Sequence, residues 1–310
     1  MIIDNNPEFG YELACSMPYA YWLHQQGKLK KIVTCQGMKP FYYFCDNVEE
    51  KYNARSIDNS NNGVQNLPNT WVHHNALAVF GKGYGELTEE ERFEANGTLD
   101  YAQWTPPPLH DFYYDDTLDL PENFILVSNS YNLEHALPPF QYFDIESLCK
   151  IFDMLTSKGY NVIYKRPKNT EFAIDANEWL GMNIKGHMEG VGEITDFQLI
   201  DHYENVFLLD DIMGNTGGTY NEAQLKIFAR AEGFVARGGG SSILCSYFQK
   251  PVIIYVCTSG DIRPGYFEKN TYFQKLSNNN VHAVVDPISV IKERGYRDYS
   301  KVYSNVNKIF

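Results

Sequence analysis

Short apolar runs joined by glycine-rich turns constrain the fold of this chain most. Residues 234–248 and 251–256 combine an apolar run, three glycines, a helical stretch and a second apolar run. This pattern predicts a buried strand, a sharp turn, a helix and another buried strand, which is half of a parallel α/β unit. Gly238, Gly239 and Gly240 permit the turn, because they lack side chains that would restrict the backbone and keep a ligand away.

The glycine turn is also a candidate phosphate site. Ser241 and Ser242 stand where the predicted helix begins, and a helix start favours negative charge through its unpaired N–H groups and its dipole. Arg237, the last residue of the predicted strand, adds a guanidinium that can bind a phosphate with two hydrogen bonds. The same residues also fit an ordinary strand-to-helix turn with a capping serine and a surface arginine.

Apolar runs and helical stretches alternate through the second half of the chain. Further strands and helices are predicted at 124–127, 144–158, 160–164, 206–209, 220–232 and 281–285. The alternation predicts a doubly wound parallel sheet, in which ligands lie beyond the carboxyl ends of the strands. A long irregular excursion is expected at 165–193, where an insertion of that size is often functional.

The first part of the chain opens like another α/β domain, with a strand at 2–3, a helix over 11–26 and a strand at 31–35. Pro18 is expected to kink or divide that helix. The three prolines at 106–108 exclude helix and inner strand, so a connection between two domains is expected there. We therefore expect an N-terminal domain at 1–115, a C-terminal domain at 120–295 and a closing helix at 298–310. The closing helix is expected to pack back on the N-terminal domain.

Polar and charged residues follow the predicted strands of the second domain. Lys165 and Arg166 end one strand, and they predict a diphosphate site together with Arg237, although a solvated basic loop is the ordinary alternative. Asn129 and Asn132 follow another strand and could bind the same ligand.

Several carboxylates are also candidates. Glu222 heads a helix, where it could accept hydrogen bonds from ribose hydroxyls or only favour the helix start. Asp210 and Asp211 follow an apolar strand, but the spaced carboxylates of a metal-diphosphate site are missing, so no metal is expected. Glu8 and Glu12 in the first domain could act as a general base, or could complement a helix dipole.

Composition excludes several classes of protein. The formal net charge of -13 argues against a nucleic-acid binder and means that a phosphate ligand needs a local cluster of cations. The six cysteines form no C-x-x-C pair, which favours free thiols in a reducing compartment. We find no signal peptide and no apolar run of about 18 residues, so we expect a cytoplasmic protein without a membrane span.

A competing motif occurs at 76–85, where apolar residues precede G-x-G-x-G, as in S-adenosylmethionine-binding methyltransferases. That motif needs a following helix and then a strand that ends in an acid. Residues 86–97 are strongly polar and the chain then runs into prolines, so we interpret the motif as a loop.

Segments 9–24, 129–132 and 225–248, the last containing the glycine turn, resemble a group of glycosyltransferases. The group includes enzymes encoded by large chlorella viruses, which build capsid glycans, and a xylosyltransferase is among them. The resemblance implies two Rossmann-like domains facing across a cleft (the GT-B arrangement) and a nucleotide-sugar donor in the C-terminal domain. It also implies no essential metal or other cofactor.

The expected activity is therefore transfer of a sugar from a nucleoside-diphosphate sugar to a glycan acceptor. UDP-xylose as the donor follows from the resemblance alone. A methyltransferase acting on glycans and a non-catalytic sugar-binding protein remain the alternatives.

Overall fold

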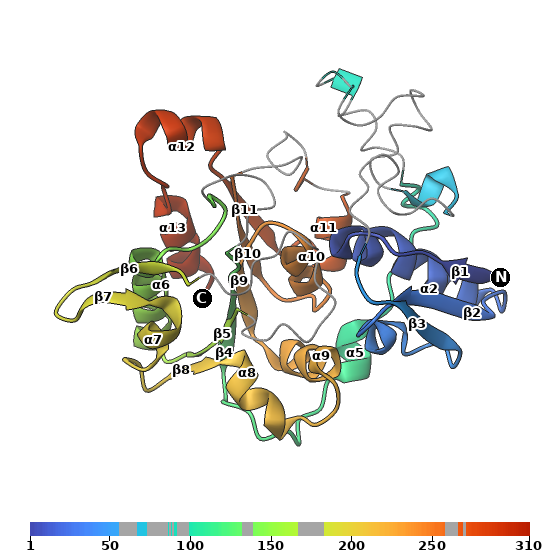
Figure 1. Cartoon of the computed structure of the whole chain (residues 1–310), viewed down its shortest axis with the longest axis horizontal. Coiled ribbons are helices and arrows are strands. Elements are labelled where there is room, and N and C mark those ends of the chain that lie inside the picture. Colours follow the sequence, from blue (N-terminus) through green and yellow to red (C-terminus); the bar gives the residue numbers. More distant parts are fainter. Residues whose placement is uncertain are drawn as a thin grey trace. The chain divides into compact units, whose positions relative to one another are not determined.

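The computed structural model of the chain describes residues 1–55, 67–72, 86, 88, 90–91, 99–131, 139–166, 183–257, 266–268 and 271–310. They divide into two compact units, a first unit within Met1–Pro108 and a second unit that begins at Leu109. The division falls directly after the three prolines. Each unit contains its own parallel sheet (Figure 1).

The first unit contains a three-stranded parallel sheet in the order β1-β2-β3. Its elements are β1 (Ile2–Asp4), α1 (Phe9–Tyr11), the π-helical turn η1 (Glu12–Ser16), α2 (Met17–Gln25), β2 (Lys31–Cys35), η2 (Lys39–Tyr42), β3 (Val48–Tyr52) and η3 (Asn69–Trp71). The expected strands at 2–3 and 31–35 are present. β3 was not expected, because its sequence V-E-E-K-Y is charged and three of its residues are exposed.

Pro18 stands where the predicted long helix is divided. The π-helical turn ends at Ser16, and Pro18 lies in the first turn of α2. Because proline has no N–H, it cannot donate to a carbonyl of the preceding turn. The indole Nε1 of Trp104 instead donates to the carbonyl of Ala14 at 2.8 Å, which ties this turn to the end of the first unit.

The second unit contains a six-stranded sheet in the order β11-β10-β9-β4-β5-β8, with parallel pairing throughout. Its elements are α5 (Leu109–Tyr113), β4 (Phe124–Ser128), α6 (Ile145–Ser157), β5 (Asn161–Lys165), β6 (Lys185–Met188), β7 (Gly192–Thr195), α7 (Asp196–Ile200), β8 (Val206–Leu208), α8 (Leu209–Ile212), η6 (Met213–Asn215), α9 (Tyr220–Arg230), β9 (Gly233–Arg237), α10 (Gly240–Ser246), β10 (Val252–Val256), α11 (Tyr272–Leu276), β11 (Val281–Val285), α12 (Ile288–Arg294) and α13 (Ser300–Ile309). This confirms the doubly wound parallel sheet.

The strand order reverses between β4 and β9. The chain starts at β4, extends the sheet in one direction through β5 and β8, and then returns to add β9, β10 and β11 on the other side. Such a reversal is the switch point of a Rossmann-like sheet, and ligands bind there beyond the carboxyl ends of the strands. Ser128 and Arg237 are the last residues of the two strands that flank this point.

Helices cover both faces of the six-stranded sheet. Figure 1 shows α6 and α13 on one side of it and α9 and α10 on the other. The buried face of α6 joins the core of the unit through Leu148, Ile151, Phe152 and Leu155. Spacings of three and four residues place these side chains along one stripe of the helix.

The C-terminal helix belongs to the second unit. α13 packs against α6, β10 and β11 there. Val302 and Val306, one helical turn apart, are fully buried in the core of the second unit. These two apolar side chains need a hydrophobic partner, and the sheet of their own unit supplies it.

The excursion expected at 165–193 is only partly irregular. Residues 167–182 lie outside the described residues, but β6 and β7 pair as an antiparallel hairpin that packs beside α6. Gly186 of this hairpin lies against Ile145, and a Cβ there would come within 2.8 Å of the Ile145 Cβ. Gly186 therefore permits the close packing of the hairpin on the helix.

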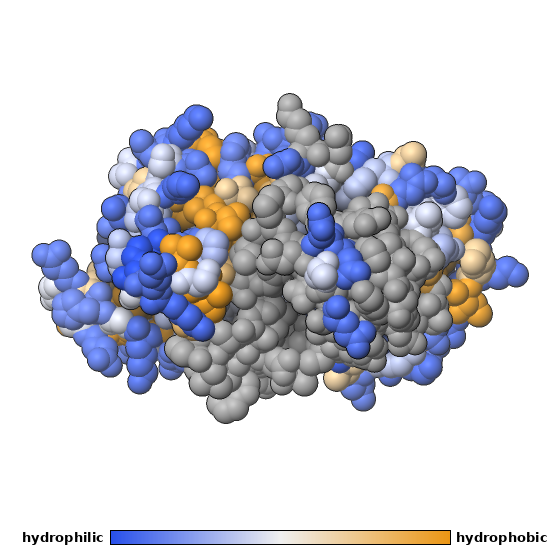
Figure 2. Space-filling view, turned by 90° about the horizontal axis from the view of Figure 1, so that it is seen from above, coloured by the Kyte–Doolittle hydropathy of each residue, from blue (hydrophilic) through white to orange (hydrophobic). Residues whose placement is uncertain are grey.

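The described surface is largely polar. On the face drawn in Figure 2, hydrophilic groups dominate and apolar groups form patches between them. The large apolar side chains that remain exposed are Met1, Ile2, Phe112, Tyr114, Val191, Val285, Val290 and Tyr296. Within the described parts of the chain, no helix combines the length and the apolar character needed to cross a bilayer.

Candidate functional site

The carboxyl ends of β4, β5, β9 and β10 bring several predicted site residues to one edge of the six-stranded sheet. Ser128 pairs with Lys165 on one side and with Ala236 on the other, and Arg237 pairs with Tyr255. Paired residues of parallel strands point to the same face, and successive residues point to opposite faces. The side chain of Lys165 therefore leaves the strand on the same face of the sheet as Ser128, whereas the side chain of Arg237 leaves on the opposite face.

Arg237 is buried at this edge without a counter-ion among the described residues. The residue is 5% exposed, and its Nε and Nη1 atoms have no hydrogen-bond partner in the described part of the chain. The buried ion pairs that the structure does contain involve Arg55 and Arg166 instead. A buried, unpaired guanidinium is costly, so this position favours a ligand that carries negative charge.

The glycine turn leaves room for the guanidinium. Gly239 has φ 111° and ψ -170°, a backbone conformation that is essentially restricted to glycine. A Cβ on Gly239 would lie 3.3 Å from Nη1 of Arg237, which is tighter than ordinary packing. Gly239 therefore permits the backbone conformation of the turn and also leaves room for the guanidinium of Arg237.

The two serines after the turn have different roles. The hydroxyl of Ser242 is fully buried and donates to the carbonyl of Gly239 at 2.7 Å, so it stabilises the turn. Ser241 accepts a hydrogen bond from Nζ of Lys165 at 3.0 Å. Gly240 is the first residue of α10, whose seven residues give only a short helix dipole. The side chains of Arg237 and Lys165 therefore matter more for anion binding than this helix start.

Lys165 reaches the turn from the face of α10. Besides its bond to Ser241, its Nζ lies 6.0 Å from the ring centre of Phe228. Burial raises the pKa of the Cys245 thiol to about 12, although the nearby charge of Lys165 acts in the opposite direction. Lys165 and Arg237 thus approach the same turn from two faces of the sheet.

Arg166, the other cation predicted at the donor site, has protein partners of its own. It is 2% exposed, forms a buried ion pair with Asp196 and stacks 4.2 Å above the ring of Phe197. Asp196 also accepts from the hydroxyl of Tyr164 at 2.9 Å. Because neighbouring residues of a strand alternate, Arg166 points away from Lys165 and anchors the end of β5 to α7.

Asn129 is also a structural residue. Its Nδ2 donates to the carbonyl of Phe143 and to the hydroxyl of Tyr164, and its Oδ1 accepts from the N–H groups of Ser130 and Phe143. These bonds use both donors and both acceptor positions of the amide. No part of the Asn129 side chain is left for a donor substrate. Asn132, the other predicted asparagine, lies outside the described residues.

Two serines beside Asn129 are candidates that sequence reasoning did not single out. The Oγ atoms of Ser128 and Ser130 are buried and have no hydrogen-bond partner in the described part of the chain. Ser128 ends β4 at the switch point, and Ser130 follows it by two residues. The alternation of the strand could have favoured Ser128 over Asn129, because Ser128 shares the face of Lys165.

Glu222 is held at the start of α9. Thr219 caps this helix by accepting from the Glu222 N–H, and the Glu222 carboxylate lies 3.1 Å from Nζ of Lys226. A Cβ on Gly218 would come within 2.5 Å of the same carboxylate, so the side chain folds over the turn before the helix. Its side chain is 37% exposed, and a contact with ribose stays a prediction.

The two candidate bases of the first unit differ. Glu12 is fully buried, forms an ion pair with Arg55 and accepts hydrogen bonds from Thr34 and Tyr42. A carboxylate in this setting is held by three partners, and its role as a general base stays a prediction. Glu8 is half-buried and accepts from the N–H of Tyr11, so it caps α1.

Acidic residues do not form an evident metal site. Asp210 and Asp211 follow β8 and lie in the first turn of α8. Among the residues that the structure describes, no three His, Cys, Asp or Glu side chains are grouped so that they could hold a metal ion.

No protein-family model and no curated protein matches the sequence. Among solved structures, Escherichia coli ADP-heptose LPS heptosyltransferase II has a TM-score of 0.51 and 12% identity, over 99% of this chain and 97% of that chain. A glycosyl transferase family 9 protein from Veillonella parvula has a TM-score of 0.47 and 11% identity, over 99% and 94%.

The iron-containing dodecameric glycosyltransferase TibC from enterotoxigenic E. coli has a TM-score of 0.41 and 12% identity over 82% of this chain. The chain spans 59% of the length of TibC. At such low sequence identity, structural similarity shows the fold alone. We base the fold comparison on heptosyltransferase II, which has a TM-score of 0.51. The chain therefore has the α/β fold with parallel sheets that is found in E. coli heptosyltransferase II.

Proposed function

We propose that this protein is a glycosyltransferase that binds the diphosphate of a nucleotide-sugar donor at the switch point of the six-stranded sheet. The observation that carries the proposal is Arg237, a buried guanidinium without a counter-ion in the described part of the chain. Its strand ends beside the point where the strand order reverses, which is where Rossmann-like sheets bind nucleotides. The shared fold with a heptosyltransferase supports this reading.

The groups around Arg237 suit a diphosphate. A guanidinium can bind two phosphate oxygens at once, and the ammonium of Lys165 adds a second positive charge at the same turn. The hydroxyls of Ser128 and Ser130 are further donors on this edge. A chain with a net charge of -13 needs such a local group of cations to bind an anion.

In the proposed reaction, the acceptor hydroxyl oxygen bonds to the anomeric carbon of the donor sugar. The bond from that carbon to the β-phosphate oxygen breaks, and the nucleoside diphosphate leaves with the electron pair. Arg237 and Lys165 would stabilise the charge that develops on this leaving group, an electrostatic task that other transferases assign to a metal ion. Independence from metal remains part of the proposal.

The proton of the acceptor hydroxyl needs a base. Burial and the ion pair with Arg55 make Glu12 the less accessible of the two predicted bases. Glu8 keeps partial exposure, so it is the first candidate among the two predicted carboxylates. The glycan nature of the acceptor is a proposal carried over from the resemblance to glycan-building enzymes.

Adenine nucleotides are the first candidates for the donor's nucleotide. The similar E. coli enzyme is named for ADP-heptose, so ADP is the first probe. UDP-xylose is the second, but it rests only on the resemblance to the chlorella-virus group, which no comparison supports. A cytoplasmic location is also proposed, because all six cysteines are free thiols.

A thermal-stability screen tests the proposal. ADP, UDP, GDP and their sugar conjugates are added to the purified protein, and a ligand that binds the native state raises the melting temperature. Arg237→Met should weaken binding of the best ligand by about 10- to 100-fold, because hydrogen bonds to charged groups contribute about 1.5–3 kcal/mol. Arg230→Met is a matched control. Arg230 is the last residue of α9, away from this edge, and donates to the carbonyl of Asp115.

Two results would contradict the proposal. Either no nucleotide raises the melting temperature, or Arg237→Met binds the best ligand as tightly as the wild type. S-adenosylmethionine belongs in the same screen, because the G-x-G-x-G segment at 81–85 lies outside the described residues. A sugar-binding protein without catalysis would bind glycan but release no nucleoside diphosphate from any nucleotide sugar.

A further inference from the structure

We infer that Gln141 is a positioning residue that holds the glycine turn in place beside Arg237 before a donor binds. The inference rests on the proposed function, because it concerns the same site. Gln141 lies in the segment that precedes α6, far in sequence from the turn, and it is 7% exposed. Its amide is therefore buried at the edge of the sheet, where it can act on backbone groups.

The amide of Gln141 joins the ends of two neighbouring strands. Its Nε2 donates to the carbonyl of Gly238 at 3.1 Å, and its Oε1 accepts from the N–H of Cys257 at 2.9 Å. Arg237 and Tyr255 form the last register pair of β9 and β10, and the Gly238 N–H still donates to the Tyr255 carbonyl. Beyond that point the strands separate, and the side chain of Gln141 bridges them.

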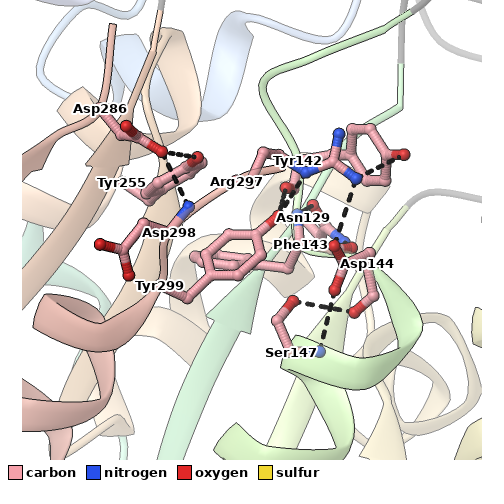
Figure 3. Close-up of polar contacts among 10 residues, drawn as sticks. All are labelled: Asn129, Tyr142, Phe143, Asp144, Ser147, Tyr255, Asp286, Arg297, Asp298 and Tyr299. Carbon is pink, nitrogen blue, oxygen red and sulfur yellow. Dashed lines mark hydrogen bonds and ion pairs between the residues drawn. The ribbon is translucent and has the colours of Figure 1, made fainter. Parts of the chain in front are cut away.

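The segment that carries Gln141 is itself fixed from two sides (Figure 3). Asn129, at the end of β4, bonds to both the N–H and the carbonyl of Phe143. On the other side, the Tyr299 hydroxyl donates to the Tyr142 carbonyl at 2.6 Å, and the guanidinium of Arg297 stacks 4.1 Å above the Tyr142 ring. The backbone on the C-terminal side of Gln141 is thus held where its amide can reach the turn.

These contacts connect the carboxyl ends of β4, β9 and β10 through one short segment. Without the amide of Gln141, the carbonyl of Gly238 and the N–H of Cys257 would each lose a hydrogen bond. Buried backbone groups rarely remain unpaired, so the turn would have to shift to find new partners. Because Arg237 packs against Gly239, a shift of the turn would also move or expose the guanidinium. Gln141 therefore preorganises the anion site without touching the ligand.

Hydrogen exchange without any ligand tests the first part of this inference. In Gln141→Leu, which keeps the approximate size but removes both bonds, the amides of 238–242 should exchange about tenfold faster. Gln274→Leu is the matched control, because the Gln274 amide also bridges two backbone groups of the same unit, the carbonyls of Phe267 and Val281. Unchanged exchange at 238–242 in Gln141→Leu, or the same increase in the control, would overturn the inference.

Affinity for ADP tests the second part. Gln141→Leu should bind ADP about tenfold more weakly than the wild type, whereas Gln274→Leu should bind it equally well. Gln141→Glu can still accept from Cys257, but an ionised carboxylate cannot donate to the Gly238 carbonyl. Burial should raise the pKa of a carboxyl group at this position. Its ADP affinity relative to the wild type should therefore be low at pH 9 and should recover as the pH is lowered toward 5 and the carboxyl group takes up a proton.

The outcomes separate this inference from the proposed function. If Gln141→Glu shows the same relative affinity at both pH values, the donated bond has no effect on the site and the positioning role is refuted. If the wild type binds neither ADP nor another nucleotide, the proposed function fails. The exchange experiment, which needs no ligand, then still decides whether Gln141 holds the turn.

Discussion

Both units contain a buried arginine near the end of a strand, and the two arginines differ in whether a carboxylate lies beside them. In the first unit, Arg55 lies 2.5 Å from the Glu12 carboxylate, and both side chains are almost completely buried. In the second unit, Arg237 is buried to a similar extent but has no counter-ion among the described residues. Both residues lie near the carboxyl ends of a parallel sheet.

The difference shows that the charge of Arg55 is compensated within the protein, whereas the position of Arg237 favours a bound anion. A buried charge is tolerated when it is paired and hydrogen-bonded, as Arg55 is. An unpaired buried charge persists only where it is compensated in another way, and a bound anion is the simplest compensation. Arg166, paired with Asp196, confirms that the second unit also supplies counter-ions where an arginine has a structural role.

Removing the counter-ion in the first unit should have the largest effect. Glu12→Leu removes the carboxylate that pairs with the buried Arg55 guanidinium, so the unfolding free energy should fall by about 3–5 kcal/mol. Urea unfolding followed by tryptophan fluorescence measures this, because three of the four tryptophans, Trp22, Trp71 and Trp104, lie in the first unit. The double variant with Arg55→Met should be more stable than Glu12→Leu alone. A single variant as stable as the wild type would mean that Arg55 needs no partner.

Gly239→Ala should have an intermediate effect on the second unit. The φ of 111° at Gly239 is strained for alanine, and the new Cβ would crowd the guanidinium of Arg237. The unfolding free energy should fall by about 1–3 kcal/mol, and nucleotide affinity should fall as well. Circular dichroism in urea measures the stability. Gly214→Ala is the control, because a Cβ there has no neighbour within 4 Å; an equal loss in both variants would contradict the special role of Gly239.

Arg237→Met should change stability least. Because Arg237 has no counter-ion among the described residues, its replacement breaks no ion pair, and we expect a change within about 1 kcal/mol in the absence of ligand. Arg166→Met breaks the pair with Asp196 and should be clearly less stable. The comparison uses urea unfolding of both variants under the same conditions. A loss of about 3 kcal/mol in Arg237→Met would show that Arg237 already has a partner.

The strands of the six-stranded sheet could be predicted because each is a short apolar run bounded by turn residues. Val252–Val256, for example, is completely buried, as expected for an inner strand of a parallel sheet. β3 could not be predicted, because Val48–Tyr52 is charged and forms the exposed edge of a small sheet. The hairpin β6–β7 was also missed, since its short strands have few apolar residues.

The site was predictable only in part. The glycine turn, Arg237 and Lys165 could be placed at one edge by the general rule for parallel sheets. Sequence alone did not separate Lys165 from Arg166, although strand alternation sends these neighbours to different partners. Likewise, Asn129 resembled a ligand-binding residue, because the bonds that saturate its amide come mainly from Phe143 and Tyr164, which are distant in sequence. Such long-range partners are set by packing and leave no local pattern.

The π-helical turn at Glu12–Ser16 holds one residue more than an α-helical turn would need. Deleting one residue there would restore the ordinary repeat, but it would rotate the preceding chain by about 100° around the helix axis. Glu12 would then swing away from Arg55. The extra residue thus sets the direction of the carboxylate, so a change in the length of this short stretch should separate Glu12 from Arg55 even when Glu12 itself is kept.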